Sequence, residues 1–326
     1  MLTEHLNNNE NIFISIACYR DTELIPTILS AYENSDNPLQ LYFGVYLQYN
    51  LEKDIFNFDS LPNGININIK RTSWENAKGP VYARYVINKY LFKNQKYYLQ
   101  IDSHTQFCKG WDTYLKGELN SLEDYSILST YPPGYKIGEE IIQRSRSNIM
   151  KFKKLSHGIP IFRTEQTTIS KPERNYFWAA GYSFSKSIVF KKVIFDKNLK
   201  NLFMGEEFLM SLRFYANNIK IYTPTRNVIY TLWNRNYRPT FWEIKNKSRI
   251  EFNFRKILSY ARLLRICNFY NPELHEEKYA IDLEKYKIPD KKIIEKYLEL
   301  IDVKKLIDEF NYKKQYRKYY FSLNND

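Results

Sequence analysis

The chain is poor in cysteine, glycine and proline. It contains 3 Cys, 10 Gly and 12 Pro among 326 residues. Three scattered cysteines are too few for a disulfide framework and fit a reducing compartment. So little Gly and Pro argues against disorder and low complexity. We therefore expect a folded cytoplasmic protein without disulfide bonds.

Long apolar runs and targeting signals are also lacking. No stretch approaches the ~18 apolar residues that a membrane span requires. The first residues show no positive segment followed by an apolar one, so we expect no signal peptide. Signatures of RNA-recognition domains, helix-turn-helix motifs and zinc fingers are missing as well, so we expect no nucleic-acid partner.

Positive charge, by contrast, is abundant. The net charge is +13, and Lys and Arg become denser after residue 186 and again over residues 304–318. A basic balance suits an anionic partner such as a nucleotide diphosphate or an acidic membrane surface. Any single lysine cluster also fits a merely solvated surface. The charge therefore leaves room for peripheral contact with an anionic membrane.

The first hundred residues alternate between apolar runs and segments of helical periodicity. This alternation predicts βαβ units and a mostly parallel sheet. Ligands bind such sheets at the carboxyl ends of the strands. The expected strands cover 12–17, 41–48, 65–69 and 97–101, and the expected helices cover 23–33 and 81–91.

The remainder of the chain divides into three parts. Residues 131–175 lack clear periodicity and are expected to form a long loop. Further strands are expected at 177–184, 220–223 and 228–232, with a helix at 206–216. From about residue 240, long helical patterns rich in Lys, Glu and Leu cover 243–267 and 290–310. We predict an α/β catalytic domain over residues 1–240 and a basic helical C-terminal extension over 241–326.

The segment with the clearest chemical pattern is Tyr97 to His104. Its apolar run reads as a buried strand that ends in Asp102, Ser103 and His104. A strand that turns after Asp102 brings a carboxylate and an imidazole around one point, and these ligands suit manganese, magnesium or zinc. One class of glycosyltransferases holds the diphosphate of a nucleotide sugar in this way. An Asp that caps a turn beside an unrelated His explains the same tripeptide.

Four other segments carry candidate binding groups, and the last of them, Tyr230 to Arg235, ends the final strand with a polar and cationic patch. Gly79-Pro80 opens a helix with Arg84 one turn in and Arg71 just upstream, which is typical of an anion site. Gly181 follows two alanines between aromatic residues, where a sugar ring could lie closely. Glu206 and Glu207 begin a later helix. Each segment alone also fits a structural role: a helix start, tight packing or a first helical turn.

Taken together and in this order, the motifs resemble the cytoplasmic polypeptide α-N-acetylglucosaminyltransferases that modify hydroxyproline. That family is distantly similar to the polypeptide GalNAc-transferases. The resemblance covers about residues 11–240. The segments that carry it are Ser15 to Asp21, Gly79-Pro80 with Ala83-Arg84, Asp102 to His104, Phe177 to Gly181, Gly205 to Glu207 and Leu232-Trp233.

The resemblance implies a Rossmann-like GT-A fold and a metal-dependent, retaining glycosyltransferase. The implied donor is a UDP-sugar, with UDP-GlcNAc favoured, and the implied metal is Mn²⁺ or Mg²⁺. The acceptor would be a hydroxyl on a protein or a glycan. Asp102 and His104 would bind the metal. The nucleotide-sugar site would include Arg20, Asp21, Arg71, Gly79, Arg84, Ser103 and Gly181, and the catalytic residues would be Glu206, Glu207 and Arg84.

One position departs from the family pattern. Thr231 stands where the family usually has a histidine, and in the related GalNAc-transferases that histidine completes the metal site. The metal would then rely on Asp102, His104, the diphosphate and water, as magnesium and manganese often do. This departure favours the alternative of a non-catalytic sugar-nucleotide or glycan-binding protein. The intact pair of Glu206 and Glu207 favours the enzyme.

Overall fold

A central sheet organises the first two thirds of the chain. The computed structural model describes residues 10–139, 141, 146–243, 249–269 and 279–316. The sheet has eight strands in the order β3-β2-β1-β4-β10-β6-β11-β9. Its bounds are β1 (Ile12–Tyr19), β2 (Leu41–Tyr49), β3 (Asn66–Ser73), β4 (Tyr97–Asp102), β6 (Ser126–Ser129), β9 (Glu173–Asn175), β10 (Tyr182–Lys186) and β11 (Lys220–Thr223).

The N-terminal strands pair as their sequence predicts. β1 runs parallel to both β2 and β4, and β2 runs parallel to β3. β10 then pairs antiparallel to β4 and to β6, while β6 and β11 are parallel. The predicted α/β class with a mostly parallel sheet is confirmed. Ala17 and Asp102 are register partners, so the ends of β1 and β4 meet at one edge.

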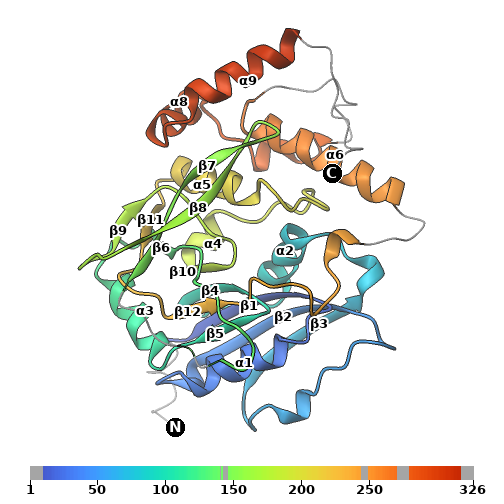
Figure 1. Cartoon of the computed structure of the whole chain (residues 1–326), viewed down its shortest axis with the longest axis vertical. Helices are drawn as coiled ribbons and strands as arrows, with labels where there is room; N and C mark the ends of the chain where they lie inside the picture. The colour runs from blue at the N-terminus through green and yellow to red at the C-terminus, as the bar shows by residue number, and fades with distance from the viewer. Residues whose placement is uncertain (1–9, 140, 142–145, 244–248, 270–278, 317–326) are drawn as a thin grey trace.

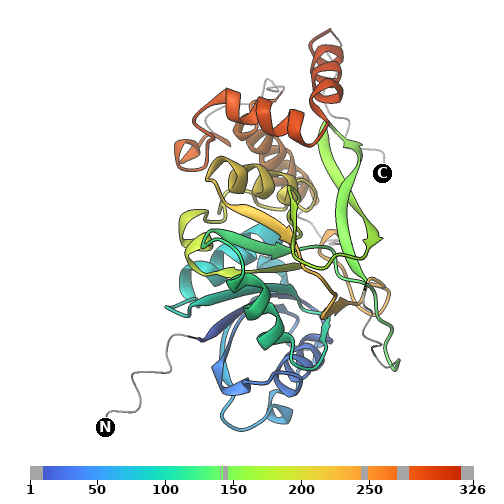
Figure 2. The same cartoon turned by 90° about the vertical axis from the view of Figure 1, so that its left-hand side faces the viewer.

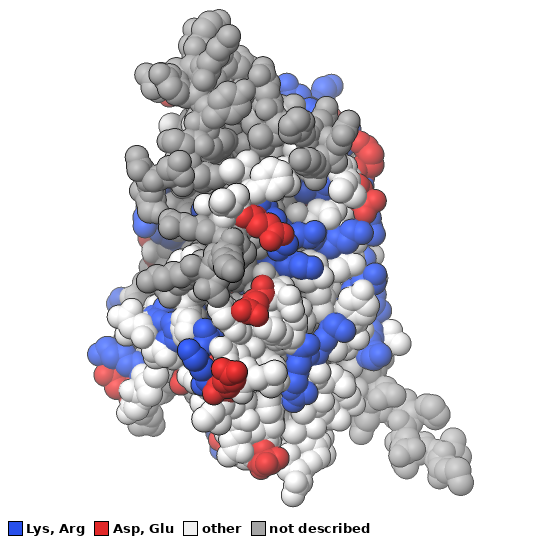
Figure 3. Space-filling view, turned by 90° about the vertical axis from the view of Figure 1, so that its right-hand side faces the viewer, with Lys and Arg blue, Asp and Glu red and all other residues white. Residues whose placement is uncertain are grey.

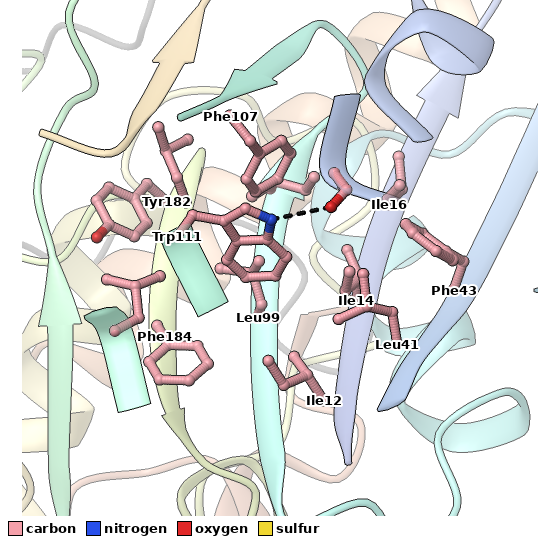
Figure 4. Close-up of a cluster of buried hydrophobic side chains, with 14 of the residues drawn as sticks. Ile12, Ile14, Ile16, Leu41, Phe43, Leu99, Phe107, Trp111, Tyr182 and Phe184 are labelled. Atoms are coloured by element: carbon pink, nitrogen blue, oxygen red, sulfur yellow. Dashed lines mark hydrogen bonds between the residues drawn. The ribbon is translucent and has the colours of Figure 1, made fainter. Parts of the chain in front are cut away.

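Helices cover both faces of the sheet because the strands bury alternate side chains on opposite sides (Figure 1). Ile12, Ile14 and Ile16 pack with the helices α1 and α3, as Figure 4 shows for the side chains around Trp111. Phe13 packs on the other face with α2, α4 and α5. These helices are α1 (Leu24–Glu33), α2 (Pro80–Tyr90), α3 (Trp111–Asn120), α4 (Ile188–Lys192) and α5 (Glu206–Ala216).

The expectation of a long loop over residues 131–175 is wrong in its second half. There β7 (Ser147–Ser156) and β8 (Ile159–Thr167) form an antiparallel hairpin that turns at His157-Gly158. Figure 2 shows this hairpin as two green strands along one side of the molecule. A second small sheet pairs β5 (Thr105–Phe107) with β12 (Ile229–Thr231). This pairing brings Thr231 opposite Thr105, next to the end of β4.

The C-terminal part is helical, as predicted, but its helices are arranged differently. The helix expected at 243–267 is α6 (Arg249–Ile266), preceded by the short turn η4 (Phe241–Glu243). The single helix expected at 290–310 is two, α8 (Lys291–Leu300) and α9 (Lys304–Tyr316). The chain breaks between them where Asp302 takes a φ of 56° and Val303 is buried.

These helices share a hydrophobic core with the sheet-bearing part. Leu263 and Tyr297 are buried together with Phe208 and Leu212 of α5. A methyl group on Gly205, just before α5, would lie 2.7 Å from a methyl carbon of Leu263. The turn that carries Glu206 therefore rests directly on α6. The division into domains at residue 240 stays a prediction.

Basic side chains are distributed over the surface. Figure 3 shows Lys and Arg spread across one face, with fewer Asp and Glu among them. Within the part of the chain that the structure describes, no helix is long and apolar enough to cross a membrane.

We predict that α6 unfolds together with the sheet. Leu263→Ala removes a fully buried side chain that rests against Gly205, so we expect a loss of about 2 to 5 kcal/mol in the free energy of unfolding. The matched control on the same helix is Ile250→Ala, because Ile250 is 85% exposed. That change should stay within about 0.5 kcal/mol. Urea unfolding followed by circular dichroism measures both, and a loss below 1 kcal/mol for Leu263→Ala would contradict the shared core.

Candidate active site

A cavity of about 400 Å³ opens at the carboxyl ends of β1, β2 and β4. This volume lies within the range of small-molecule sites. Its wall combines the strand ends, the start of α2, the turn before α5, part of β8 and the segment after β12. The chemically distinctive residues on this wall include Gln48, Gly79, Arg84, Asp102, Ser103, His104, Tyr131, Gly181, Glu206, Glu207, Thr231, Trp233, Arg235 and Trp242.

Arg84 joins two of the carboxylates on this wall. Its Nη1 lies 2.6 Å from Oε2 of Glu206, and its Nη2 lies 3.3 Å from Oδ1 of Asp102. Burial opposes the charge of Arg84, but the neighbouring carboxylates raise its pKa. Burial also raises the pKa of Glu206, against the effect of Arg84. These two ion pairs bring α2, β4 and α5 together around the buried guanidinium of Arg84.

The second oxygen of Asp102 faces the imidazole of His104. Asp102 Oδ2 lies 3.9 Å from Nε2 of His104. A Cβ atom on Gly181 would come within 2.8 Å of the same oxygen. A larger residue at position 181 would therefore displace this carboxylate. In the structure, Gly181 leaves room for the carboxylate of Asp102. Its position beside the sugar stays a prediction.

His104 is fixed from its other side. Its Nδ1 lies 2.8 Å from Oδ2 of Asp21, which also accepts a hydrogen bond of 2.7 Å from Ser103 Oγ. Thr27 of α1 holds the turn by donating to the carbonyl of Ser103 and accepting from the amide of Thr105. The turn after β4 is thus built by groups on α1 and at the end of β1.

Glu207 occupies a different environment from Glu206. Its Oε1 accepts a hydrogen bond of 2.9 Å from the amide of Ala180, and its Oε2 accepts one from the hydroxyl of Tyr131. Burial raises the pKa of Glu207 to about 7, although both hydrogen bonds oppose this. The two adjacent carboxylates therefore differ: Glu206 is paired with a cation, and Glu207 is held by neutral donors.

Thr231 and the segment after it complete the wall. Thr231 is buried, and its Oγ1 lies 3.4 Å from the carbonyl oxygen of His104. Beyond it, the guanidinium of Arg235 lies over the rings of Phe203 and Trp242, 5.5 and 5.2 Å from their centroids. Phe203, Trp233 and Trp242 are about half exposed. The cavity thus has a polar floor and an aromatic rim.

Three predicted nucleotide-site residues do not line this cavity. Arg20 forms an ion pair of 2.8 Å with Asp54 and lies over the ring of Trp74. Arg71 lies over the ring of Phe58. The side chain of Asp21 is fully buried behind His104. The other predicted site residues, Gly79, Arg84, Asp102, Ser103, His104, Gly181, Glu206 and Glu207, lie on the wall together.

Sequence reasoning missed Gln48, Tyr131 and Trp242, whereas Trp233 and Arg235 belong to the predicted segment Tyr230 to Arg235 and do lie on the wall. Gln48 is the last residue but one of β2, and its Nε2 donates to the carbonyl of Cys18 at 3.3 Å. Among the described residues its buried Oε1 has no hydrogen-bond partner. Its position could have revealed it, since a polar side chain at the carboxyl end of a parallel strand is a candidate binding residue. Tyr131 lay in the expected loop and gave no such signal.

Comparison with known proteins identifies the family. The family model described as Glycosyltransferase (GlcNAc) matches residues 11–64 and 54–306. The chain belongs to this glycosyltransferase family. The match extends well past residue 240, so the sequence similarity to the family includes α6 and α8. The predicted enzyme class and the predicted resemblance are confirmed at this level.

Solved structures confirm the GT-A fold of this glycosyltransferase. A crystal structure of GalNAc-T7 with UDP, GalNAc and Mn²⁺ aligns with a TM-score of 0.57 and 14% identity, over 93% of this chain and 57% of that one. The glycosyltransferase thus spans little more than half of the GalNAc-T7 chain. A structure of S. aureus TarS residues 1–349 with UDP-GlcNAc aligns with a TM-score of 0.51 and 12% identity, over 95% of this chain and 93% of that one. No curated protein sequence matches.

We predict that Glu207 makes stability depend on pH. Its pKa rises from 4.5 to about 7 on folding, so the folded state keeps this proton while the unfolded state loses it. The stability contributed by Glu207 is complete below about pH 4.5 and is lost as the pH rises through 7. Relative to Glu207→Gln, the wild type should lose roughly 3 kcal/mol over that range. Urea unfolding at pH 4.5, 6 and 8 tests this, and a difference that does not change with pH would contradict it.

Proposed function

We propose that this glycosyltransferase transfers GlcNAc from UDP-GlcNAc to a hydroxyl acceptor, with a divalent metal and with retention of anomeric configuration. The observation that carries the proposal is the facing pair of Asp102 Oδ2 and His104 Nε2 on the cavity wall, next to the buried Arg84. The family supplies the reaction class. The UDP-sugar donor is also consistent with the ligands named for GalNAc-T7 and TarS.

The donor set fits a divalent cation. Metal–ligand bonds of about 2.1 Å place two ligands about 3 to 4.2 Å apart, depending on the angle between the bonds. The separation of 3.9 Å between Asp102 Oδ2 and His104 Nε2 falls in this range. Among the described residues, no three His, Cys, Asp or Glu side chains are grouped for a metal. We therefore infer two protein ligands, with the diphosphate and water supplying the others.

Gln48 is our candidate for the nucleobase. Its side-chain oxygen is a buried acceptor without a partner among the described residues, and Gln48 is one of the residues that line the cavity. Uracil offers one N–H group that such an acceptor can bind. Gly79, where φ is 89°, caps the N-terminus of α2, and it lines the same cavity together with Pro80 and Arg84. These features suit a nucleotide diphosphate.

We favour front-face departure of UDP, in which a donor phosphate oxygen takes the acceptor's proton. When bound, the metal would offset the negative charge that grows on the leaving diphosphate. Arg84 adds a fixed positive charge and holds the Asp102 carboxylate in place. A double displacement on Glu206 or Glu207 is disfavoured, because Glu206 is paired with Arg84 and Glu207 already accepts two hydrogen bonds. Both carboxylates are better suited to orienting sugar or acceptor hydroxyls.

The acceptor and the cellular setting are further parts of the proposal. The half-exposed rings of Phe203, Trp233 and Trp242 form a rim that a glycan or peptide acceptor can contact. The three cysteines are free and buried, which supports a reducing, cytoplasmic setting. Contact with an anionic membrane rests on the basic surface.

We predict UDP release from UDP-GlcNAc in the presence of Mn²⁺. This release should exceed that from UDP-glucose, UDP-galactose or sugar nucleotides of other bases, and should fall on addition of EDTA. Asp102→Asn removes the charged ligand and should lower the rate by about 10²- to 10³-fold. The control is Asp124→Asn, an exposed carboxylate in an ion pair with Lys186. Absence of UDP release from every UDP-sugar, with Mn²⁺ present, would overturn the proposed function.

We also predict that Thr231→His tightens Mn²⁺ binding. Thr231 lies on the cavity wall beside His104, so an imidazole there adds a third protein ligand. Because even an outer-shell partner contributes about 10- to 100-fold to metal affinity, we expect a gain of at least about 10-fold. Thr231→Val is the matched control, since it removes the hydroxyl without adding a ligand. Mn²⁺ titration by electron paramagnetic resonance measures both, and equal affinities would show that position 231 does not face the metal.

A further inference from the structure

Asp21 is a fully buried carboxylate behind the cavity wall. It follows Arg20, whose φ of 50° turns the chain out of β1. Its Oδ1 accepts hydrogen bonds of 3.1 Å from the amide of Glu23 and 2.9 Å from the hydroxyl of Tyr237. Its Oδ2 lies 3.0 Å from Nε of Arg238, in addition to its contacts with Ser103 and His104. Both oxygens are therefore already surrounded by donors.

This environment determines which ring nitrogen of His104 carries the proton and which one has a free lone pair. An ionised carboxylate oxygen that accepts from a serine and forms an ion pair with an arginine can only accept from Nδ1 as well. The proton of the neutral imidazole is then on Nδ1, and the lone pair is on Nε2. Nε2 is the nitrogen that lies 3.9 Å from Oδ2 of Asp102 on the cavity wall. A carboxylate that binds the far nitrogen of a metal-ligating histidine fixes both its tautomer and the orientation of its ring.

We propose that Asp21 is a positioning residue that holds His104 in the Nδ1–H tautomer, with Nε2 directed toward Asp102 for metal binding. The proposal rests on the proposed metal-dependent function, and it assigns Asp21 a role other than contact with the nucleotide. The zero exposure of its side chain and its absence from the cavity wall are consistent with that assignment. Tyr237 and Arg238 anchor the same carboxylate from the segment that follows Thr231. One buried group thus contacts both His104 and the segment that follows Thr231.

The first test is read on the wild type and needs no substitution at Asp21. In the metal-free wild type, the ¹⁵N shifts of the His104 ring should be those of the Nδ1–H tautomer. The chain has four histidines, and His104→Gln identifies the His104 signals by their loss. A wild-type ring protonated on Nε2 would overturn the proposal whatever the variants do.

The second test is Asp21→Asn in the full chain. The amide can donate to Nδ1, so we expect the Nδ1–H population to fall and Mn²⁺ affinity, measured by electron paramagnetic resonance, to drop about 10- to 100-fold. The matched control is Asp54→Asn, which also removes a carboxylate that binds an arginine next to β1 but does not touch His104. Asp54→Asn should leave both readouts unchanged. A folded Asp21→Asn protein with the wild-type tautomer and Mn²⁺ affinity would contradict the role of Asp21.

A milder variant covers the case in which Asp21→Asn does not fold. Tyr237→Phe removes one donor to Asp21 while keeping the carboxylate, so the tautomer should persist and Mn²⁺ affinity should fall by less than 10-fold. An inverted tautomer in this variant would contradict the proposal. Failure of the proposed function looks different: a wild type with the predicted tautomer that binds no Mn²⁺ and releases no UDP rejects the metal-dependent reaction, because the ¹⁵N readout does not require a metal.

Discussion

The buried guanidinium of Arg84 is the interaction on which the site depends. It carries a positive charge into the buried edge of the cavity and contacts Glu206 and Asp102, which come from distant parts of the chain. Loss of one partner of such a pair leaves an uncompensated buried charge, which typically costs about 3 to 5 kcal/mol. Because Arg84 occupies Oδ1 of Asp102, the Oδ2 atom is left to face His104. The two oxygens of Asp102 therefore have different partners because Arg84 binds one of them.

A second buried charge completes the arrangement on the opposite side. Asp21 contacts His104, while Tyr237 and Arg238 contact Asp21 from the far end of the predicted catalytic domain. The cavity is therefore bounded by two polar clusters, one centred on Arg84 and the other on Asp21. The first cluster joins α2, β4 and α5, and the second joins the segments that follow β1, β4 and β12. Formation of the site and completion of the fold are for this reason coupled.

The elements that the sequence predicted well are those with strong local patterns. The parallel strands β1, β2 and β4 are continuous apolar runs buried on both faces, which is why periodicity found them. The hairpin of β7 and β8 was missed because only the start of β7 is buried, and its other end carries exposed lysines around a register shift. Its strands are held by pairing with each other and by packing against α5, neither of which a local pattern reveals. The break between α8 and α9 was hidden for a similar reason, since Ile301 and Val303 continue the apolar spacing through a turn.

The family could be identified from the sequence, and most of the predicted site residues lie together on the cavity wall. The order of short motifs identified the family, and strand ends placed Asp102 and His104 at the edge where ligands bind. Only the tertiary structure decided which charged groups meet. His104 contacts Asp21, which is 83 positions away in the sequence, and Arg84 contacts Glu206, which is 122 positions away. Arg20, by contrast, pairs with Asp54 away from the cavity. The physical reason is that a buried charge must be matched by whichever group the topology brings within hydrogen-bonding distance, and spacing along the chain does not encode that distance.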